Sequence, residues 1–321
     1  MLVGITGGTG FIGKALVLRH IVAGDTVRLL SRCSENKTML PKSVELFHGD
    51  LTGQVAQLVR FVDKVDILYH CAAETKDQNK MHSVNVEGTR NLCIAASQRI
   101  GHWVQLSSVG TYGSQYRGII TEETPLLRMG SIYEKTKTES DQLVIDFSRR
   151  SAFTYSILRP CKILGLRMTD KSVFQMITFI SKGIFFFIGK SGASANYVHV
   201  DNVVEGLVLC GKMSAAKGRI YNLSDHRTIE DFVGIIANEL RKPLPKLRLP
   251  EIPVRWIARL CEGLPHFPLT AARVKGLTSR AVYSIERIQH ELGYVHQVSI
   301  EDGLRQMVNA WKQATLKTHH P

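Results

Sequence analysis

A glycine-rich stretch at residues 4–13, with the sequence GITGGTGFIG, constrains the fold more than any other feature. An apolar run precedes it, and an amphipathic stretch over residues 11–21 follows it. Gly8, Gly10 and Gly13 have the spacing that lets a strand turn tightly into a helix and lets a pyrophosphate approach the backbone. The unpaired N–H groups and the dipole at a helix start favour a negative charge. The pattern predicts a dinucleotide-binding turn rather than a purely structural one.

The composition is that of an ordinary globular protein with an excess of positive charge. Among 321 residues, 44% are hydrophobic and 21% are charged, which suits one large or two modest domains with a sizeable core. The formal net charge of +13 allows binding to nucleic acid, an anionic membrane or an anionic small molecule. Because Lys and Arg are spread along the chain, we expect a diffusely basic enzyme and no nucleic-acid partner.

The cysteines and histidines form no pattern that is typical of a metal site. The six cysteines lie far apart without a CxxC pair, and the histidines, His199 among them, lack partners at ligand spacing. We therefore expect no metal and reduced thiols. The first predicted strand begins at Leu2, and no apolar run approaches the length of a membrane span, so we expect a cytoplasmic protein.

The end of the second predicted strand, at residues 26–32, bears on the choice of cofactor. About 20 residues beyond the glycines, an acidic side chain would bind the ribose hydroxyls of NAD. This chain has Ser31 and Arg32 there, a hydroxyl and a guanidinium that suit a 2′-phosphate. A solvated loop cation is the alternative interpretation of Arg32. With the glycine loop upstream, we favour NADP over NAD.

Strand-like and helical patterns alternate along the chain. Strands are expected from Leu2 and at residues 26–32, 44–50, 65–73, 103–108, 153–158, 197–201 and 220–223, and helices at 11–21, 54–61, 86–99, 131–149, 203–210, 286–292 and 300–311. This alternation predicts an α/β fold with βαβ units in a Rossmann-type, doubly wound parallel sheet. We assign residues 1–165, completed by 196–224, to an NADP-binding domain. Residues 166–195 and 225–321 are assigned to a smaller, mostly C-terminal α/β substrate-binding region.

Three side chains near the predicted strand ends could carry chemistry. Tyr133 and Lys137 are four residues apart on a helix that Ser131 and Glu134 open as a capping box, so they share a face. A tyrosine can exchange its phenolic proton with a substrate oxygen while a hydride moves, and a nearby lysine would lower its pKa from about 10. Ser108 could hold the carbonyl oxygen. YxxxK alone arises by chance in many helices, but beside the glycine loop it indicates a hydride-transfer site.

These motifs together resemble the extended short-chain dehydrogenases/reductases of the NAD-dependent epimerase/dehydratase superfamily, nearly from end to end. The resemblance implies a small-molecule substrate and a homodimer that packs the helices at residues 86–99 and 133–149 together. It implies catalytic roles for Ser108, Tyr133 and Lys137, the lysine also holding the nicotinamide ribose, and a strand-stabilising role for Asn85. The residues that it assigns to the cofactor site are Gly7, Gly8, Thr9, Gly10, Phe11, Ile12, Gly13, Ser31, Arg32, Asp50, Leu51, Cys71, Ala72, Ala73, Asn85, Ser107, Tyr133, Lys137, Pro160 and Lys162.

Departures from the superfamily pattern bear on the substrate. The 4,6-dehydratases place an Asp-Glu pair after the catalytic serine, where this chain has Val109 and Gly110, which argues against water elimination. Lys162 stands where sugar-nucleotide epimerases usually have asparagine, and Ala195 and Asn196 where they often have an arginine for the diphosphate. Both changes argue against a nucleotide sugar, although Lys162 could itself hold a phosphate. The segments 197–204, 277–280 and 291–294 look more like the 3β-hydroxysteroid dehydrogenase and dihydroflavonol reductase branch.

From this resemblance we expect an NAD(P)-dependent oxidoreductase that interconverts a secondary alcohol and a ketone. A nucleotide-sugar epimerase or reductase of the same superfamily is the first alternative. A redox-inactive NADP-binding sensor is the second, although a sensor has no need of Ser108, Tyr133 and Lys137. The apolar run at residues 184–188 suits an apolar substrate pocket, a buried strand or a subunit contact equally well.

One basic, proline-broken segment allows a different kind of contact. Residues 241–248 lead into Arg255, Trp256, Ile257, Arg259 and Leu260, so that cations stand beside apolar side chains. Such a helix can rest on an anionic membrane surface. A helix that covers the substrate site, with its arginines in water, is the interpretation that we favour from the sequence.

Overall fold

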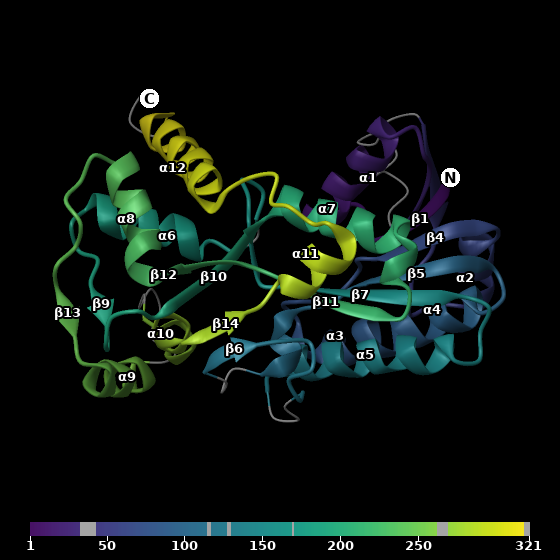
Figure 1. Cartoon of the computed structure of the whole chain (residues 1–321), viewed down its shortest axis with the longest axis horizontal. Coiled ribbons are helices and arrows are strands. Elements are labelled where there is room, and N and C mark those ends of the chain that lie inside the picture. The colour runs from purple at the N-terminus through teal and green to yellow at the C-terminus, as the bar shows by residue number, and fades with distance from the viewer. Residues whose placement is uncertain (33–42, 114–116, 127–129, 169, 262–268, 318–321) are drawn as a thin grey trace.

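The computed structural model describes residues 1–32, 43–113, 117–126, 130–168, 170–261 and 269–317 (Figure 1). The molecule is elongated, with a large sheet and its helices on one side and a smaller lobe on the other (Figure 1). The carboxyl ends of the large sheet's strands face this smaller lobe (Figure 1). In open α/β sheets that edge is where ligands bind.

The large sheet has seven strands in the order β11-β7-β5-β4-β1-β2-β3, and all of its neighbouring pairs are parallel. Its strands are β1 (Leu2–Thr6), β2 (Thr26–Ser31), β3 (Val44–His48), β4 (Val65–His70), β5 (Ile100–Leu106), β7 (Thr154–Pro160) and β11 (Arg219–Leu223). The strand order reverses between β1 and β4, which is the switch point of a doubly wound fold. The predicted Rossmann-type sheet is confirmed.

Helices cover both faces of this sheet and give each face its own core. One face carries α1 (Phe11–Val22), α7 (Val200–Lys212) and α11 (Glu286–Leu292), and the other carries α2 (Val55–Val62), α4 (Gly88–Ala96) and α5 (Ile132–Ser148) (Figure 1). Leu16 and Leu207 are fully buried on the first face, and Leu58 and Leu92 on the second. Because both faces are covered, the strands read as nearly continuous apolar runs.

The helix expected at residues 86–99 starts and ends elsewhere. The short helix α3 (Gln78–His82) leads into a π-helical segment, Ser83–Glu87, which continues directly as α4 (Gly88–Ala96). The segment buries Asn85 and Val86. A π-helical turn of this kind often lies at a functional site, and here it carries one of the predicted site residues.

The smaller lobe combines short strands with five helices among the described residues. A three-stranded sheet runs β12 (Asp225–Thr228), β10 (Ser194–His199) and β8 (Lys162–Leu164), and β13 (Arg248–Leu249) pairs with β9 (Phe187–Ile188). The helices are α6 (Ser172–Ser181), α8 (Ile229–Glu239), α9 (Glu251–Leu260), α10 (Ala271–Thr278) and α12 (Ile300–Lys317). A second core, with Phe232, Ile177 and Leu304 fully buried, joins α6, α8 and α12.

A two-stranded parallel sheet joins two segments that lie far apart in the sequence, since β6 (Gly118–Ile120) pairs with β14 (Ala281–Tyr283). The apolar run at residues 184–188 ends as β9, where Phe187 and Ile188 are buried while Ile184 is exposed. For these two residues the buried-strand interpretation is therefore the correct one. Across the described ranges, no helix has both the length and the hydropathy of a membrane span.

Candidate active site

The glycine loop is packed so tightly that side chains would not fit at three of its positions. Gly7 has a φ of +71°, and a Cβ there would lie 2.7 Å from the Ala72 backbone nitrogen. A Cβ on Gly13 would lie 2.2 Å from the Gly7 carbonyl oxygen, and one on Gly8 would lie 2.2 Å from Leu29 Cδ1. The loop therefore holds α1 directly against β1 and the end of β4, as the glycine spacing predicts.

The start of α1 has the features of an anion-binding helix end. Its N-cap is Gly10, which has no side chain to cap the first turn, and that turn carries no acidic residue. Thr9 and Gly10 are exposed at the tip, and Phe11 and Ile12 are half-buried. The backbone N–H groups of the first turn are therefore available to a phosphate.

The residues at the carboxyl ends of β2 and β3 are the ones that the sequence predicts to contact the adenosine of the cofactor. Ser31 is buried and Arg32 is exposed. Asp50 Oδ1 accepts hydrogen bonds from the backbone nitrogen and the hydroxyl of Thr52, both at 2.9 Å. Asp50 thus closes its own turn, and Leu51 is buried behind it.

A row of buried, hydrogen-bonded side chains connects β1, β4 and α4. The sequence did not predict it. Thr6 Oγ1 lies 2.7 Å from His70 Nδ1, and His70 Nε2 lies 2.9 Å from Thr89 Oγ1. The Ala72 nitrogen donates to Thr6 Oγ1 at 3.2 Å, so this chain fixes the segment from Cys71 to Ala73. Burial, with Lys137 nearby, lowers the pKa of His70 to about 3, so the imidazole is neutral at physiological pH.

Asn85 ties the segment after β4 to α5. Its Oδ1 accepts from the Glu74 nitrogen at 2.7 Å, and its Nδ2 donates to the Glu74 carbonyl at 3.0 Å and to Thr136 Oγ1 at 3.1 Å. Each side of the amide is therefore engaged within the protein. This geometry is that of a structural clamp, in keeping with a strand-stabilising asparagine.

Ser108 and Tyr133 are brought together at the end of β5. Ser108 caps the 3-10 turn Val109–Tyr112, with its Oγ accepting from the Gly110 nitrogen at 3.0 Å. Tyr133 lies in the first turn of α5, which begins with the predicted capping box. Burial and Asp141 raise the pKa of Tyr133 to about 12, against a hydrogen bond with Ser108 that lowers it. The phenol is therefore protonated at neutral pH.

Lys137 lies one turn further along α5 and is buried. Its Nζ donates to the Leu106 carbonyl oxygen at 2.6 Å, which anchors the ammonium at the end of β5. Burial lowers the pKa of Lys137, while Asp141 and Cys71 oppose that shift. The lysine was expected to lower the pKa of Tyr133, but the net shift of the tyrosine in this structure is upward.

A buried ion pair stands directly behind these side chains. Asp141 and Arg159 are 1% and 2% exposed, and Asp141 Oδ2 accepts from Arg159 Nη2 at 3.1 Å, Arg159 Nε at 3.3 Å and Ser107 Oγ at 2.7 Å. Arg159 Nη1 reaches the Tyr112 hydroxyl at 3.2 Å. Burial raises the pKa of Asp141, and Arg159, Ser107 and Lys137 oppose that shift. The pair locks α5 to β7 and to the Ser107–Ser108 strand end.

Neither Asp141 nor Arg159 was among the predicted site residues. A signal for Asp141 was present, because it follows Tyr133 by eight residues and Lys137 by four, which places the three side chains on one helix face. Arg159 gave a weaker signal, as a charged residue inside an otherwise apolar strand. Its partner lies on another element, and sequence spacing does not reveal that contact.

Pro160 and Lys162 lead from the large sheet into the smaller lobe. Pro160 ends β7 and is buried, whereas Lys162, on β8, is exposed. Lys162 Nζ lies 5.6 Å from the centre of the Tyr197 ring, and a Cβ on Gly276 of α10 would lie 3.5 Å from it. The ammonium thus stands between β10 and α10.

At positions 195 and 196, where sugar-nucleotide epimerases often have an arginine for the diphosphate, this chain supplies no cation. Ala195 is buried, and Asn196 Nδ2 donates to the Ala281 carbonyl at 2.8 Å. Val109, in the place of a dehydratase aspartate, is buried as well. Within the described ranges, no group of three or more His, Cys, Asp or Glu side chains is arranged to hold a metal ion.

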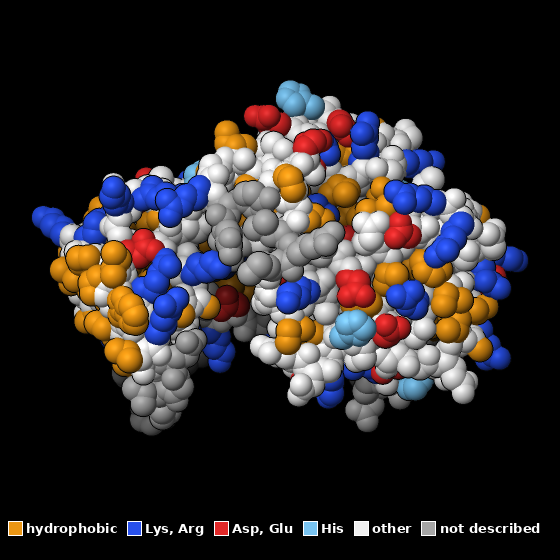
Figure 2. Space-filling model, turned by 90° about the horizontal axis from the view of Figure 1, so that it is seen from below, with side chains coloured by type: hydrophobic (Ala, Val, Ile, Leu, Met, Phe, Trp, Pro, Cys, Tyr) orange, Lys and Arg blue, Asp and Glu red, His pale blue; other side chains and the backbone are white. Residues whose placement is uncertain are grey.

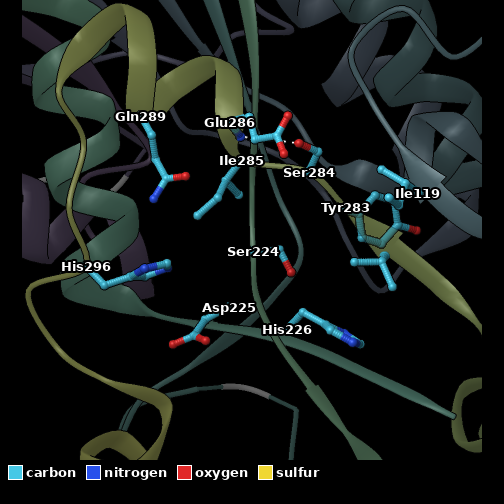
Figure 3. A pocket seen from close by; sticks show the side chains of 11 residues that line it. Ile119, Ser224, Asp225, His226, Tyr283, Ser284, Ile285, Glu286, Gln289 and His296 are labelled. Carbon is cyan, nitrogen blue, oxygen red and sulfur yellow. Dashed lines mark hydrogen bonds between the residues drawn. The ribbon is translucent and has the colours of Figure 1, made fainter. Parts of the chain in front are cut away.

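A separate cavity of about 340 Å³ lies where β12, β14 and α11 meet (Figure 3). Its lining residues come from four segments and are Ile119, Ser224, Asp225, His226, Val282, Tyr283, Ser284, Ile285, Glu286, Gln289 and His296. Neither Ser108 nor Tyr133 lines it. Tyr283, one wall of the cavity, packs against Tyr112 with ring centres 6.3 Å apart, so the cavity adjoins the network around Arg159.

Comparison with known proteins points to one family. Residues 3–224 match the model of the NAD-dependent epimerase/dehydratase family. The chain is 26% identical to the 3 beta-hydroxysteroid dehydrogenase/Delta 5→4-isomerase of Mycobacterium tuberculosis, covering 90% of this chain and 85% of that protein. It is 26% identical to the 4-hydroxy-2-methyl-3-oxo-4-farnesyl-3,4-dihydroquinoline-1-oxide ketoreductase of Stigmatella aurantiaca, covering 94% and 93%. Among solved structures, UDP-glucuronic acid 4-epimerase from Bacillus cereus in complex with NAD superposes with a TM-score of 0.76 at 19% identity, covering 98% and 99%.

Proposed function

This chain belongs to the NAD-dependent epimerase/dehydratase family, and from that membership we propose that it interconverts a secondary alcohol and a ketone by hydride transfer with NAD(P). The observation that carries the proposal is the meeting of Ser108 and Tyr133 at the end of β5, one helical turn from Lys137. The names of the two relatives, a dehydrogenase and a ketoreductase, support an oxidoreductase. The substrate is a small molecule.

The residues of the sheet edge fit a dinucleotide. The exposed start of α1 would hold the pyrophosphate on its backbone N–H groups. The tight turn that presents this helix start depends on glycine, since a Cβ at Gly7 would meet the Ala72 backbone and one at Gly13 the Gly7 carbonyl oxygen. Lys137 would hold the nicotinamide ribose. When bound, the nicotinamide supplies or accepts the hydride. We also propose that residues 1–165 with 196–224 form the cofactor domain, and that 166–195 with 225–321 form the substrate region. Two parts of the fold cross these bounds, because β8 and β10 pair in the sheet of the smaller lobe and α11 packs on the large sheet.

The chain's own side chains would move the proton. In this structure the pKa of Tyr133 is raised to about 12, so the phenol is protonated at neutral pH. In the reductive direction it would donate this proton to the carbonyl oxygen. Ser108 would donate a hydrogen bond to that oxygen and hold it in line with the phenol. The Asp141–Arg159 ion pair would keep the Ser107–Ser108 strand end and α5 in fixed register.

We propose NADP as the preferred cofactor because Ser31 and Arg32 follow β2 where NAD enzymes have an acidic residue. The Bacillus cereus structure contains NAD, so the preference rests on these two residues of this chain. Replacing Arg32 by Ala should weaken NADPH binding about 10- to 100-fold, the effect of one charge-assisted hydrogen bond, and should leave NADH binding nearly unchanged. Fluorescence titration with both cofactors measures this. Tighter binding of NADH than NADPH by the unaltered chain would overturn the preference.

A nucleotide-sugar epimerase is the alternative, favoured by the likeness to the Bacillus cereus enzyme. The buried Ala195 and the engaged Asn196 weigh against it, because neither offers a cation to a diphosphate. Two assays separate the functions. An oxidoreductase consumes NADPH when a panel of ketones is supplied, whereas an epimerase retains its nicotinamide through purification and converts UDP-hexoses without net redox change.

We also propose a homodimer that pairs α4 and α5 of two copies, as in the superfamily that the sequence resembles. Exposed Ile94 on α4 gives that face an apolar residue to bury. Sedimentation equilibrium of the purified chain measures the mass of the assembly. A monomer at micromolar concentration would contradict this pairing.

A further inference from the structure

Helix α9 (Glu251–Leu260) carries apolar side chains on two different faces. Val254 and Ala258 are buried and belong to the same small core as Ile188 and Val274. The opposite face is open to solvent: Ile252 is 72% exposed, Trp256 61% and Leu260 81%, and Ile257 also lies in the open. Ile252, Trp256 and Leu260 follow one another at intervals of four residues, so they form a continuous stripe.

Basic residues outnumber acidic ones in the segment that carries this stripe. Between residues 241 and 260 the chain has a single acidic residue, Glu251, and six basic ones: Arg241, Lys242, Lys246, Arg248, Arg255 and Arg259. Arg255 and Arg259 lie one helical turn apart along one side of the stripe, and both are exposed. Arg255 also forms an ion pair with Glu251 on the same helix. Figure 2, which views the molecule from below, shows hydrophobic side chains gathered at the left, where α9 lies, with Lys and Arg side chains beside them.

The stripe is not explained by the packing of the fold. Single exposed apolar residues are ordinary on a protein surface, but a row of large ones along one helix marks a contact site. Folding buries the Val254 and Ala258 face instead, so the stripe serves neither the core nor the pairing of α9 with α10. An amphipathic helix with Trp and Leu on one side and arginines at its border matches the chemistry of an anionic lipid surface.

We propose that α9 docks on the surface of an anionic membrane, with Ile252, Trp256 and Leu260 among the headgroups. Arg255 and Arg259 would then lie at the level of the lipid phosphates. Charge favours this occupant over a second copy of the chain, because two copies paired through α9 would bring their basic borders together. The molecule would rest on the membrane without entering it, since no described helix has the character of a span.

The docked helix lies close to the candidate substrate region. α9 packs on α10, and Gly276 of α10 faces the ammonium of Lys162. Docking would therefore place the wall of that region beside the lipid surface. This inference rests on the exposed stripe and its charges alone, and it stands whether the substrate is a ketone or a nucleotide sugar.

Vesicle flotation with the whole chain tests the proposal. Vesicles of equal parts phosphatidylglycerol and phosphatidylcholine should carry the protein at low salt, and vesicles of phosphatidylcholine alone should carry much less. The double variant Ile252→Ser with Leu260→Ser should bind the anionic vesicles about tenfold or more weakly. The matched control is Leu18→Ser with Val22→Ser, two exposed aliphatic residues four apart on α1, which should bind like the unaltered chain.

Tryptophan fluorescence and a second double variant test the same proposal independently. Trp256 is the exposed tryptophan among the described residues, and its emission should shift to shorter wavelength on anionic vesicles. Should the serine variant fail to fold, Arg255→Gln with Arg259→Gln keeps the apolar stripe, removes two cations together with the Arg255–Glu251 ion pair, and should still lose binding. Equal binding by all variants, or no binding of the unaltered chain at low salt, would overturn the proposal. The proposal would also be overturned if, without lipid, the serine variant sedimented with a lower mass than the unaltered chain. That result would show that the stripe is an interface between two copies of the chain.

Discussion

At the scale of residues, the candidate site depends on buried polar groups that hold one another. Asp141 accepts from Ser107 and Arg159, and it shares a face of α5 with Tyr133 and Lys137. A buried charge is tolerated only when it is paired and hydrogen-bonded. The reactive side chains are thus positioned by an ion pair that itself has no direct part in the proposed proton transfer.

Removing one partner of this ion pair should be costly. Asp141→Asn leaves the buried guanidinium of Arg159 without its counter-charge, so we expect the free energy of unfolding to fall by about 3–5 kcal/mol. Urea unfolding followed by circular dichroism measures this. The control is Asp146→Asn on the same helix, an exposed partner of Arg149, which should cost less than about 1 kcal/mol. Equal stability of the two variants would contradict the assignment.

Two buried histidines should make the stability depend on pH. Burial lowers the pKa of His70 to about 3 and that of His102 to about 4, from an ordinary value of 6.5. The unfolded chain therefore binds protons between about pH 6.5 and 4 that the folded chain does not. The stability is fully present above pH 6.5 and is lost as the pH falls, by up to about 1.4 kcal/mol per pH unit for each histidine.

Urea unfolding between pH 7.5 and 4.5 tests this dependence. His102→Gln removes one titrating group and should make the decline shallower, whereas His290→Gln, an exposed substitution on α11, should leave it unchanged. Glutamine can replace some of the hydrogen bonds that His102 makes to Thr154 and Ser156. A decline with the same slope in His102→Gln would show that other groups cause it.

At the scale of elements, the glycine turn between β1 and α1 positions the cofactor edge. Its geometry is local, which is why the spacing of Gly8, Gly10 and Gly13 predicts it from the sequence. The Tyr133–Lys137 face and the capping box at Ser131 are local as well, and both could be predicted for the same reason. The N-cap of α8 has an equally local signal, because Thr228 Oγ1 accepts from the Asp231 backbone nitrogen and donates to the Asp231 carboxylate.

Contacts between distant segments could not be predicted. The pairing of β6 with β14 joins Ile119 to Val282, and no periodicity in either segment identifies the other. The contact of Asp141 with Arg159 and the position of Lys162 between Tyr197 and Gly276 are likewise set by tertiary packing. Sequence patterns report what each element buries, and only the fold determines which elements meet.

A substitution in the glycine turn should weaken cofactor binding. In Gly13→Ala the new Cβ meets the Gly7 carbonyl oxygen at 2.2 Å, so the glycine loop must shift and the start of α1 with it. We expect NADPH affinity to fall about tenfold or more, measured by titration calorimetry. Gly234→Ala, inside α8 with its nearest neighbour at 3.8 Å, is the control and should stabilise the chain by about 0.5–1 kcal/mol without changing affinity. Unchanged affinity in Gly13→Ala would refute the cofactor site.

At the scale of the whole molecule, the large sheet provides the cofactor edge and the smaller lobe faces it (Figure 1). The candidate catalytic residues lie on the sheet side, and Lys162, β10 and α10 form part of the facing wall. The net charge of +13 suits both an anionic cofactor at the edge and an anionic surface beneath α9. The same excess of charge thus contributes to two separate contacts.

The central claim is that Tyr133 transfers the proton while NAD(P) carries the hydride. The direct measurement is kcat/KM for NADPH-dependent reduction of the best ketone in the panel, compared between the unaltered chain, Tyr133→Phe and the control Tyr155→Phe on β7. We expect a loss of about 10²- to 10⁴-fold in Tyr133→Phe with NADPH binding retained, and no comparable loss in Tyr155→Phe. Turnover that survives unchanged in Tyr133→Phe would contradict it.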